Sequence, residues 1–94
     1  MSTFDVKTDT LLTAAETLQK AIETFDGAAG QAAAAGDAVC ADWEGDAKVK
    51  FQAEQDRVEQ WYKQMSAAAQ TGVTILKEIA QQYQEADEAA AGSI

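Results

Sequence analysis

Apolar residues recur along the first part of the chain at steps that alternate between four and three. This first row consists of Phe4, Thr8, Leu11, Ala15, Leu18, Ile22, Phe25, Ala29, Ala32, Gly36, Val39 and Trp43. Only Thr8 in it is polar. Side chains at this spacing share one face of a helix, and the strict alternation is typical of the seam between packed helices. The pattern predicts a helix over residues 5–40.

The second part of the chain has a similar row and an additional stripe beside it. The second row consists of Ala47, Phe51, Glu54, Val58, Trp61, Met65, Ala68, Gly72, Ile75, Ile79, Gln82 and Ala86. The stripe consists of Tyr62, Ala69, Leu76, Tyr83 and Ala90. Together they form an apolar face wider than a two-stranded seam requires. We expect a helix over residues 46–88 and a flexible tail over residues 89–94.

A short polar segment, residues 41–45, separates the two rows and predicts a tight turn. Gly45 can adopt a positive φ, and Asp42 or Asp46 can cap the following helix. Each helix would be about 50 Å long or more. The chain is therefore expected to be a single helical-hairpin domain over residues 1–94.

Residues 27–38 allow a second interpretation, because three glycines interrupt the first helix there. Each glycine costs roughly 1 kcal/mol relative to alanine inside a helix, so a flexible linker is the alternative. The first row keeps its spacing through this segment, which favours a helix, with a kink near Gly27 or Gly30 left open.

The predicted fold class is all-α, an antiparallel two-helix hairpin that dimerises into a four-helix bundle. In the hairpin we expect Gly36 to face Phe51 and Ile22 to face Met65, and Phe25 to face Trp61 and Tyr62. One hairpin would leave the wide face of the second helix in water, so we infer association. The expected core and dimer residues are Leu11, Leu18, Ile22, Phe25, Phe51, Val58, Trp61, Met65, Ile75 and Ile79.

Composition excludes several classes of function. Among 94 residues there are 16 acids, 7 bases and no histidine, giving a net charge of −9, which argues against nucleic acid and anionic membranes as partners. The one cysteine, Cys40, forms no disulfide framework or zinc site, and we expect a free, packed thiol. Glu54 and Asp56, two positions apart, do not share a helix face. We expect no catalytic residues, no metal, no cofactor and no small-molecule substrate.

Two motifs carry a family resemblance. Trp43-Glu44-Gly45 lies between the two long helices, and Tyr83 and Asp87 form a Y-x-x-x-[D/E] pattern near the end of the second. With the chain length, they resemble the WXG family of small, early-secreted-antigen-like substrates of type VII secretion. The start of the chain has no basic segment followed by an apolar one, so we expect no ordinary signal peptide.

The resemblance implies that the chain acts without catalysis and is secreted or displayed at the cell surface, without a cleaved signal peptide. Its expected partners are itself in a homodimer or a sibling WXG protein in a heterodimer, an FtsK-type secretion ATPase, and a larger secreted effector. The implied signal is composite: Trp43 and Gly45 of one subunit beside Tyr83 and Asp87 of the other. Ile94 would be a further apolar contact to the ATPase.

Each of these residues also has a purely structural interpretation. Trp43 can plug the end of the bundle, Gly45 can let Trp43 approach the helices, and Tyr83 can pack in the core. Asp87 lies at the carboxyl end of its helix, where an acid is electrostatically unfavourable. An intracellular helical-bundle adaptor and a membrane-active hairpin are the alternative functions.

Overall fold

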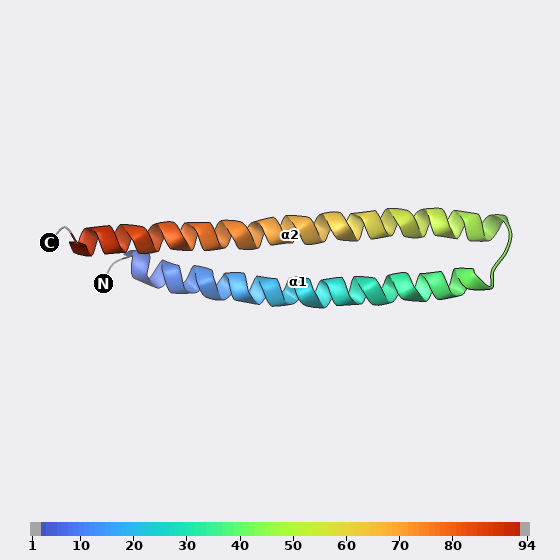
Figure 1. The fold of residues 1–94 in the computed structure, drawn as a ribbon, viewed down its shortest axis with the longest axis horizontal. Coiled ribbons are helices and arrows are strands. Elements are labelled where there is room, and N and C mark those ends of the chain that lie inside the picture. Colours follow the sequence, from blue (N-terminus) through green and yellow to red (C-terminus); the bar gives the residue numbers. More distant parts are fainter. Residues whose placement is uncertain (1–2, 93–94) are drawn as a thin grey trace. The chain divides into compact units, whose positions relative to one another are not determined.

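A computed structural model describes residues 3–92, and the side chains from residue 8 onward. It contains two helices, α1 (Thr3–Ala41, 39 residues) and α2 (Asp46–Gly92, 47 residues), joined by a turn over residues 42–45 (Figure 1). The all-α antiparallel two-helix hairpin is confirmed. α2 continues through Gly92, so residues 89–92 are helical where we expected a tail. The side chain of Phe4 and residues 93–94, including Ile94, lie outside the described part.

Residues 27–38 belong to α1, so the linker interpretation of this segment is wrong. Gly27 and Gly30 lie on exposed positions, and nothing lies within 4 Å of a Cβ atom added to either. Alanines fill most of the segment and have the highest helix propensity of all residues. Their propensity offsets the cost of the glycines, and α1 remains a single helix.

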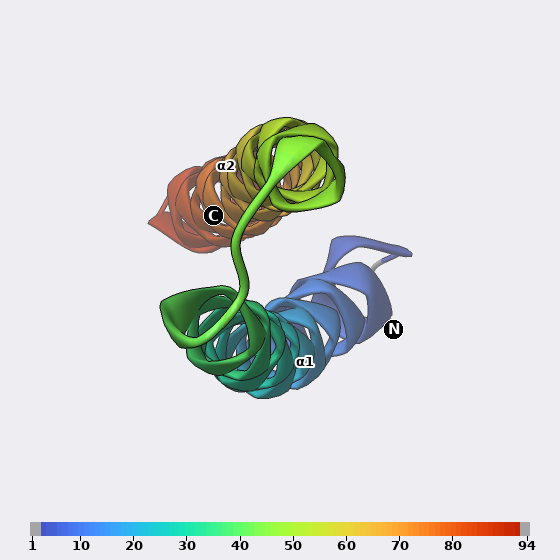
Figure 2. The same cartoon turned by 90° about the vertical axis from the view of Figure 1, so that its right-hand side faces the viewer.

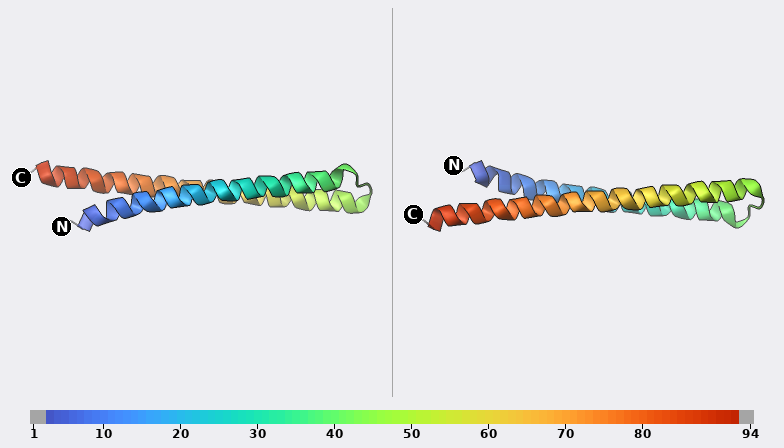
Figure 3. Two further views of the ribbon diagram at one scale, coloured as in Figure 1. Left: turned by 90° about the horizontal axis from the view of Figure 1, so that it is seen from below. Right: turned by 90° about the horizontal axis from the view of Figure 1, so that it is seen from above.

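The hairpin divides into two compact units, each with one segment of either helix. We call them the turn unit (Ile22–Ala68) and the terminal unit (Met1–Ala21 with Ala69–Ile94). In each unit, the α1 segment lies alongside the α2 segment and runs in the opposite direction (Figures 1 and 3). Figure 2 looks onto the turn unit and shows the loop that connects the end of α1 to the start of α2.

The turn unit is held together by a few apolar and aromatic contacts. Ile22 and Cys40 are buried, and Cys40 is a free thiol, as expected from the sequence. The rings of Phe25 and Tyr62 meet edge to face, with centroids 5.5 Å apart and planes at 89°. Such a pair contributes about 0.5–1.5 kcal/mol beyond the area it buries. The Phe25–Tyr62 pair is one of those we expected between the helices.

The terminal unit has a core of small residues. Ala15, Val73 and Ala80 are buried, and Val73 is the largest fully buried side chain among the described residues. The Leu18 side chain lies 3.7 Å from the position of a Cβ atom at Gly72. Small residues let two helices approach closely, but they remove little apolar surface from water. The core of this unit is therefore thin.

The face of α1 that contacts α2 differs from the first row after Ala29. Two predicted inner positions, Ala32 and Val39, are exposed, and the residues after them, Ala33 and Cys40, face inward instead. Val39 is 55% exposed, whereas Cys40 is 5% exposed. A strict repeat of seven residues drifts around a helix that has 3.6 residues per turn. The inner positions Phe25, Ala29 and Ala33 are separated by two successive steps of four, which brings the inner face back toward α2.

The face of α2 that contacts α1 is largely the stripe and not the second row. Tyr62, Ala69, Leu76 and Tyr83 of the stripe are half-buried. Most large residues of the second row are exposed, Met65 among them at 42%. The expected pairing of Ile22 with Met65 stays a prediction. Gly36 faces Gln55 and not Phe51. Of the stripe, Ala90 alone is exposed.

Candidate functional site

The turn between the helices places Trp43 and Gly45. The Trp43 N–H donates to the Cys40 carbonyl at 3.3 Å, just after the end of α1. The Val49 N–H donates to the Gly45 carbonyl at 3.3 Å, at the start of α2. The Trp43 ring is half-buried and tilted against Phe51, with the ring centroids 5.8 Å apart. Trp43 therefore packs on Phe51 near the start of α2 while part of its ring stays accessible.

The backbone conformation at position 45 requires a glycine. Its φ is +104°, and no other described residue has a positive φ. L-residues rarely adopt this conformation, whereas glycine adopts it at little cost. Nothing lies within 4 Å of a Cβ atom added to Gly45. The expectation that this glycine makes room for Trp43 is therefore wrong, and the turn geometry is the reason for it.

Three acidic residues surround the turn. Asp42, Glu44 and Asp46 are exposed, and Asp46 lies in the first turn of α2, where a carboxylate interacts favourably with the helix dipole. Within residues 3–92, no group of three or more histidine, cysteine or acidic side chains is arranged to hold a metal ion.

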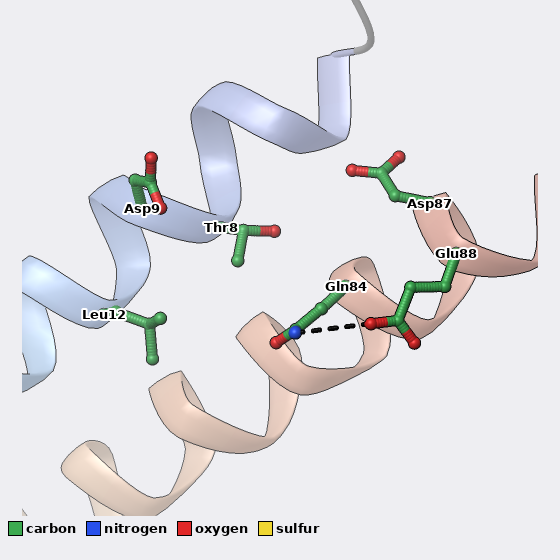
Figure 4. Close-up of a pocket in the computed structure, with 6 residues that line it drawn as sticks. All are labelled: Thr8, Asp9, Leu12, Gln84, Asp87 and Glu88. Atoms are coloured by element: carbon green, nitrogen blue, oxygen red, sulfur yellow. Dashed lines mark hydrogen bonds between the residues drawn. The ribbon is translucent and has the colours of Figure 1, made fainter. Parts of the chain in front are cut away.

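Tyr83 and Asp87 lie one helical turn apart on the inner side of α2, and both are half-buried. Tyr83 lies three positions after Ala80, which is buried in the core of the terminal unit. Asp87 lines a shallow groove between the helices of this unit (Figure 4). The groove is lined by Thr8, Asp9, Leu12, Gln84, Asp87 and Glu88.

The groove brings Asp87 toward the start of α1, a neighbour that the sequence did not reveal. In Figure 4 its carboxylate is directed toward the side on which α1 begins, and that of Glu88 is turned back along α2. Glu88 accepts a hydrogen bond from Gln84 Nε2 at 3.5 Å. The amino-terminal end of a helix carries a partial positive charge. An acid that is unfavourable at the end of α2 is therefore favourable beside the start of α1.

The structure brings each pair of predicted signal residues together, but in different units. Trp43 and Gly45 belong to the turn unit, and Tyr83 and Asp87 belong to the terminal unit. Of the predicted core and dimer residues, Leu11, Leu18, Ile22, Phe25 and Ile79 are buried or half-buried, and Phe51, Val58, Trp61, Met65 and Ile75 are exposed. Contact of the exposed group with a partner stays a prediction.

Gln55 is an important residue that we missed in the sequence. Its Nε2 donates to the Ala33 carbonyl at 3.1 Å, to Asp37 Oδ1 at 3.1 Å and to Glu59 Oε1 at 3.3 Å. Its side chain covers Gly36. Gln55 precedes Tyr62 by one heptad and so continues the stripe toward the turn, which is the signal that could have identified it.

Comparison with known proteins adds the decisive observation. The family described as "Proteins of 100 residues with WXG" matches residues 3–88. The chain belongs to the WXG100 family. No curated protein and no solved structure matches the chain.

Membership of the WXG100 family implies a non-enzymatic protein that is a substrate of type VII secretion. Proteins of this family typically dimerise, and the exposed apolar residues of α2 fit a partner interface. Neither helix, over the described residues, is long and apolar enough to cross a membrane.

Proposed function

We propose that this WXG100 protein is exported as a folded dimer and that an FtsK-type secretion ATPase recognises it through a composite signal. The signal combines Trp43 and Gly45 of one subunit with Tyr83 and Asp87 of the partner subunit. The protein acts by binding, as a secretion substrate or as the escort of a larger secreted effector.

The observation that carries this proposal is the division of the four residues between two units. The turn unit holds Trp43 and Gly45, and the terminal unit holds Tyr83 and Asp87. In an antiparallel dimer, the turn of each subunit lies near the carboxyl end of the partner subunit. Only a paired protein would then present the complete signal, and export would select folded dimers.

The accessibility of the four residues supports a role in recognition. Trp43, Tyr83 and Asp87 are half-buried, so each is held by its own unit and still offers part of its surface. Side chains fixed by packing lose little conformational entropy when a partner binds them. Gly45 contributes the backbone conformation that positions Trp43.

An export assay tests the proposal. The chain is expressed in a bacterium with a type VII secretion system, and the amounts in the medium and in the cells are compared. We expect Trp43→Ala and Tyr83→Phe to abolish most export while circular dichroism and light scattering show an intact helical dimer. Tyr62→Phe is the matched control, because Tyr62 lies on the same stripe of α2 within the turn unit, and it should be exported normally.

Mixed dimers give the sharper result. A Trp43→Ala subunit paired with a Tyr83→Phe subunit retains one complete composite signal, formed by the intact residues of each. The other signal in that dimer lacks both residues. We expect the mixed dimer to be exported, unlike either variant alone. Normal export of both single variants would refute the composite signal, whereas a wild-type chain that stays in the cells would favour the intracellular adaptor.

A further inference from the structure

Trp43 lies between the two helices, so no helix fixes the direction of its side chain. α1 ends at Ala41 and α2 begins at Asp46. The backbone at Trp43 is held by the 3.3 Å hydrogen bond from its N–H to the Cys40 carbonyl. A bond of this kind fixes the backbone but leaves the three staggered rotamers open to the side chain. The direction of the indole ring therefore depends on what the ring contacts.

Phe51 provides such a contact. The ring centroids of Trp43 and Phe51 lie 5.8 Å apart, with the ring planes at 44°. This separation falls within the range of about 4.5–7 Å over which aromatic rings attract each other. Phe51 itself belongs to α2, and a helix restricts the rotamers of the side chains that it carries. Phe51 is thus the fixed member of the pair, and Trp43 is the member that needs to be held.

The position of Phe51 in α2 explains why its ring reaches the turn. Side chains of a helix lean toward the amino terminus of that helix. Phe51 lies in the second turn of α2, so its ring leans toward the loop that precedes Asp46. Neither ring is fully covered, because Phe51 is 38% exposed and Trp43 is half-buried. The contact therefore orders the Trp43 ring without hiding it.

We propose that Phe51 is a positioning residue for Trp43 and that export requires an aromatic ring at position 51. Gly45 sets the backbone of the turn through its φ of +104°, and Phe51 sets the direction of the Trp43 ring. The inference rests on the proposed function, because it takes Trp43 as a group that the secretion ATPase recognises. It adds to the signal a residue that lies outside the Trp43-Glu44-Gly45 motif.

The strength of an aromatic pair sets the size of the expected effect. The attraction between two rings, beyond the area they bury, corresponds to about a two- to tenfold change in an equilibrium constant. Without the ring at position 51, the population with a correctly directed Trp43 should fall by about that factor. The apparent affinity of a partner decreases in proportion to the population that is competent to bind.

Substitution of Phe51 in the full-length chain tests the role of its ring. Phe51→Leu removes the ring but keeps an apolar side chain of high helix propensity, so α2 should remain intact. In the export assay we expect the secreted amount to fall about two- to tenfold, while circular dichroism and light scattering show an unchanged helical dimer. Phe51→Tyr retains the ring and should be exported as wild type is. Normal export of Phe51→Leu, or poor export of Phe51→Tyr, would overturn the proposal.

A spectroscopic signature shows whether Phe51 acts through Trp43. Protein labelled with 5-fluorotryptophan gives one fluorine NMR signal for each of its two tryptophans, and Trp43→Phe identifies the Trp43 signal by its loss. In Phe51→Leu we expect this signal to move and the Trp61 signal to stay, because the Phe51 ring lies against Trp43. Lost export with an unchanged Trp43 signal would contradict the positioning role, as would a Phe51→Leu protein that no longer dimerises.

Phe25→Leu is the matched control. It makes the same substitution in the same unit and removes the aromatic pair of Phe25 with Tyr62, which does not include Trp43. The Trp43 signal should stay in place, and export should be normal. If this control loses as much export as Phe51→Leu does, the effect is a general destabilisation of the turn unit and the proposal fails.

This inference and the proposed function fail in different ways. If Trp43→Ala blocks export and Phe51→Leu does not, the composite signal stands and only the role of Phe51 is refuted. If Trp43→Ala is exported normally, the composite signal is refuted and the role of Phe51 in export falls with it.

Discussion

Three glycines of α1 provide a test of the hairpin seam, because their surroundings differ. Gly27 and Gly30 are exposed, with nothing within 4 Å of an added Cβ atom. At Gly36 an added Cβ atom would lie 2.6 Å from Cδ, Oε1 and Nε2 of Gln55. Replacing a helical glycine by alanine stabilises by about 0.5–1 kcal/mol when the space is free. We expect this gain for Gly27→Ala and for Gly30→Ala.

Gly36→Ala should lose that gain. The end of the Gln55 side chain is flexible and can move aside, but then its hydrogen bonds to the Ala33 carbonyl and to Asp37 are broken. Each is worth roughly 0.5–1.5 kcal/mol net, and the exposed bond to Asp37 lies at the low end. The expected result is a free energy of unfolding about 1–2 kcal/mol below that of Gly30→Ala.

Urea unfolding followed by far-ultraviolet circular dichroism measures these differences. All variants are compared at one protein concentration, because association would contribute to stability. Gln55→Ala provides the double-mutant cycle, since in that background Gly36→Ala should stabilise as Gly30→Ala does. Equal stabilisation by all three alanine substitutions in the wild-type background would refute the Gln55–Gly36 contact.

Two further predictions concern the turn unit. Val39→Asp should change the free energy of unfolding by no more than about 0.5 kcal/mol, whereas Cys40→Asp should lower it by roughly 2 kcal/mol or more, because only Cys40 is buried. If denaturant unfolding gives the reverse order, the α1 register is wrong. A double-mutant cycle of Phe25→Leu and Tyr62→Leu should give a coupling energy of about 0.5–1.5 kcal/mol for the edge-to-face pair. Strictly additive losses would contradict that contact.

The helices and the turn could be predicted because periodicity and one glycine determine them. The face of α1 after Ala29 could not, because Ala32 to Ala35 are all alanine and no hydrophobic contrast marks the inner position. Val39 and Cys40 are similarly both apolar. The choice between Ala32 and Ala33 depends on how the helix drifts against its partner over several turns, which is a property of the packed pair.

For a related reason, the sequence did not show which face of α2 packs against α1. Both the second row and the stripe are apolar, and one α1 helix can cover only one of them. The resemblance to the WXG family singled out Trp43, Gly45, Tyr83 and Asp87, whose role stays a prediction. The sequence did not reveal the groove around Asp87, because Thr8 and Leu12 are far from it along the chain. Gln55 went unnoticed because its importance depends on Gly36 of the other helix.

The distribution of residue sizes differs between the buried seam and the outside of α2. Two helices that share one seam approach most closely through small residues, and the seam of this hairpin buries Ala15, Val73 and Ala80. Trp61 and Met65 lie outside the seam, at 54% and 42% exposure. The largest apolar surfaces are thus left for another molecule, and little of the available burial is gained within one chain. If the proposed dimer covers these surfaces, association would supply much of the stability of the hairpin and would couple folding to pairing. An exporter that reads both subunits would then also test whether each is folded.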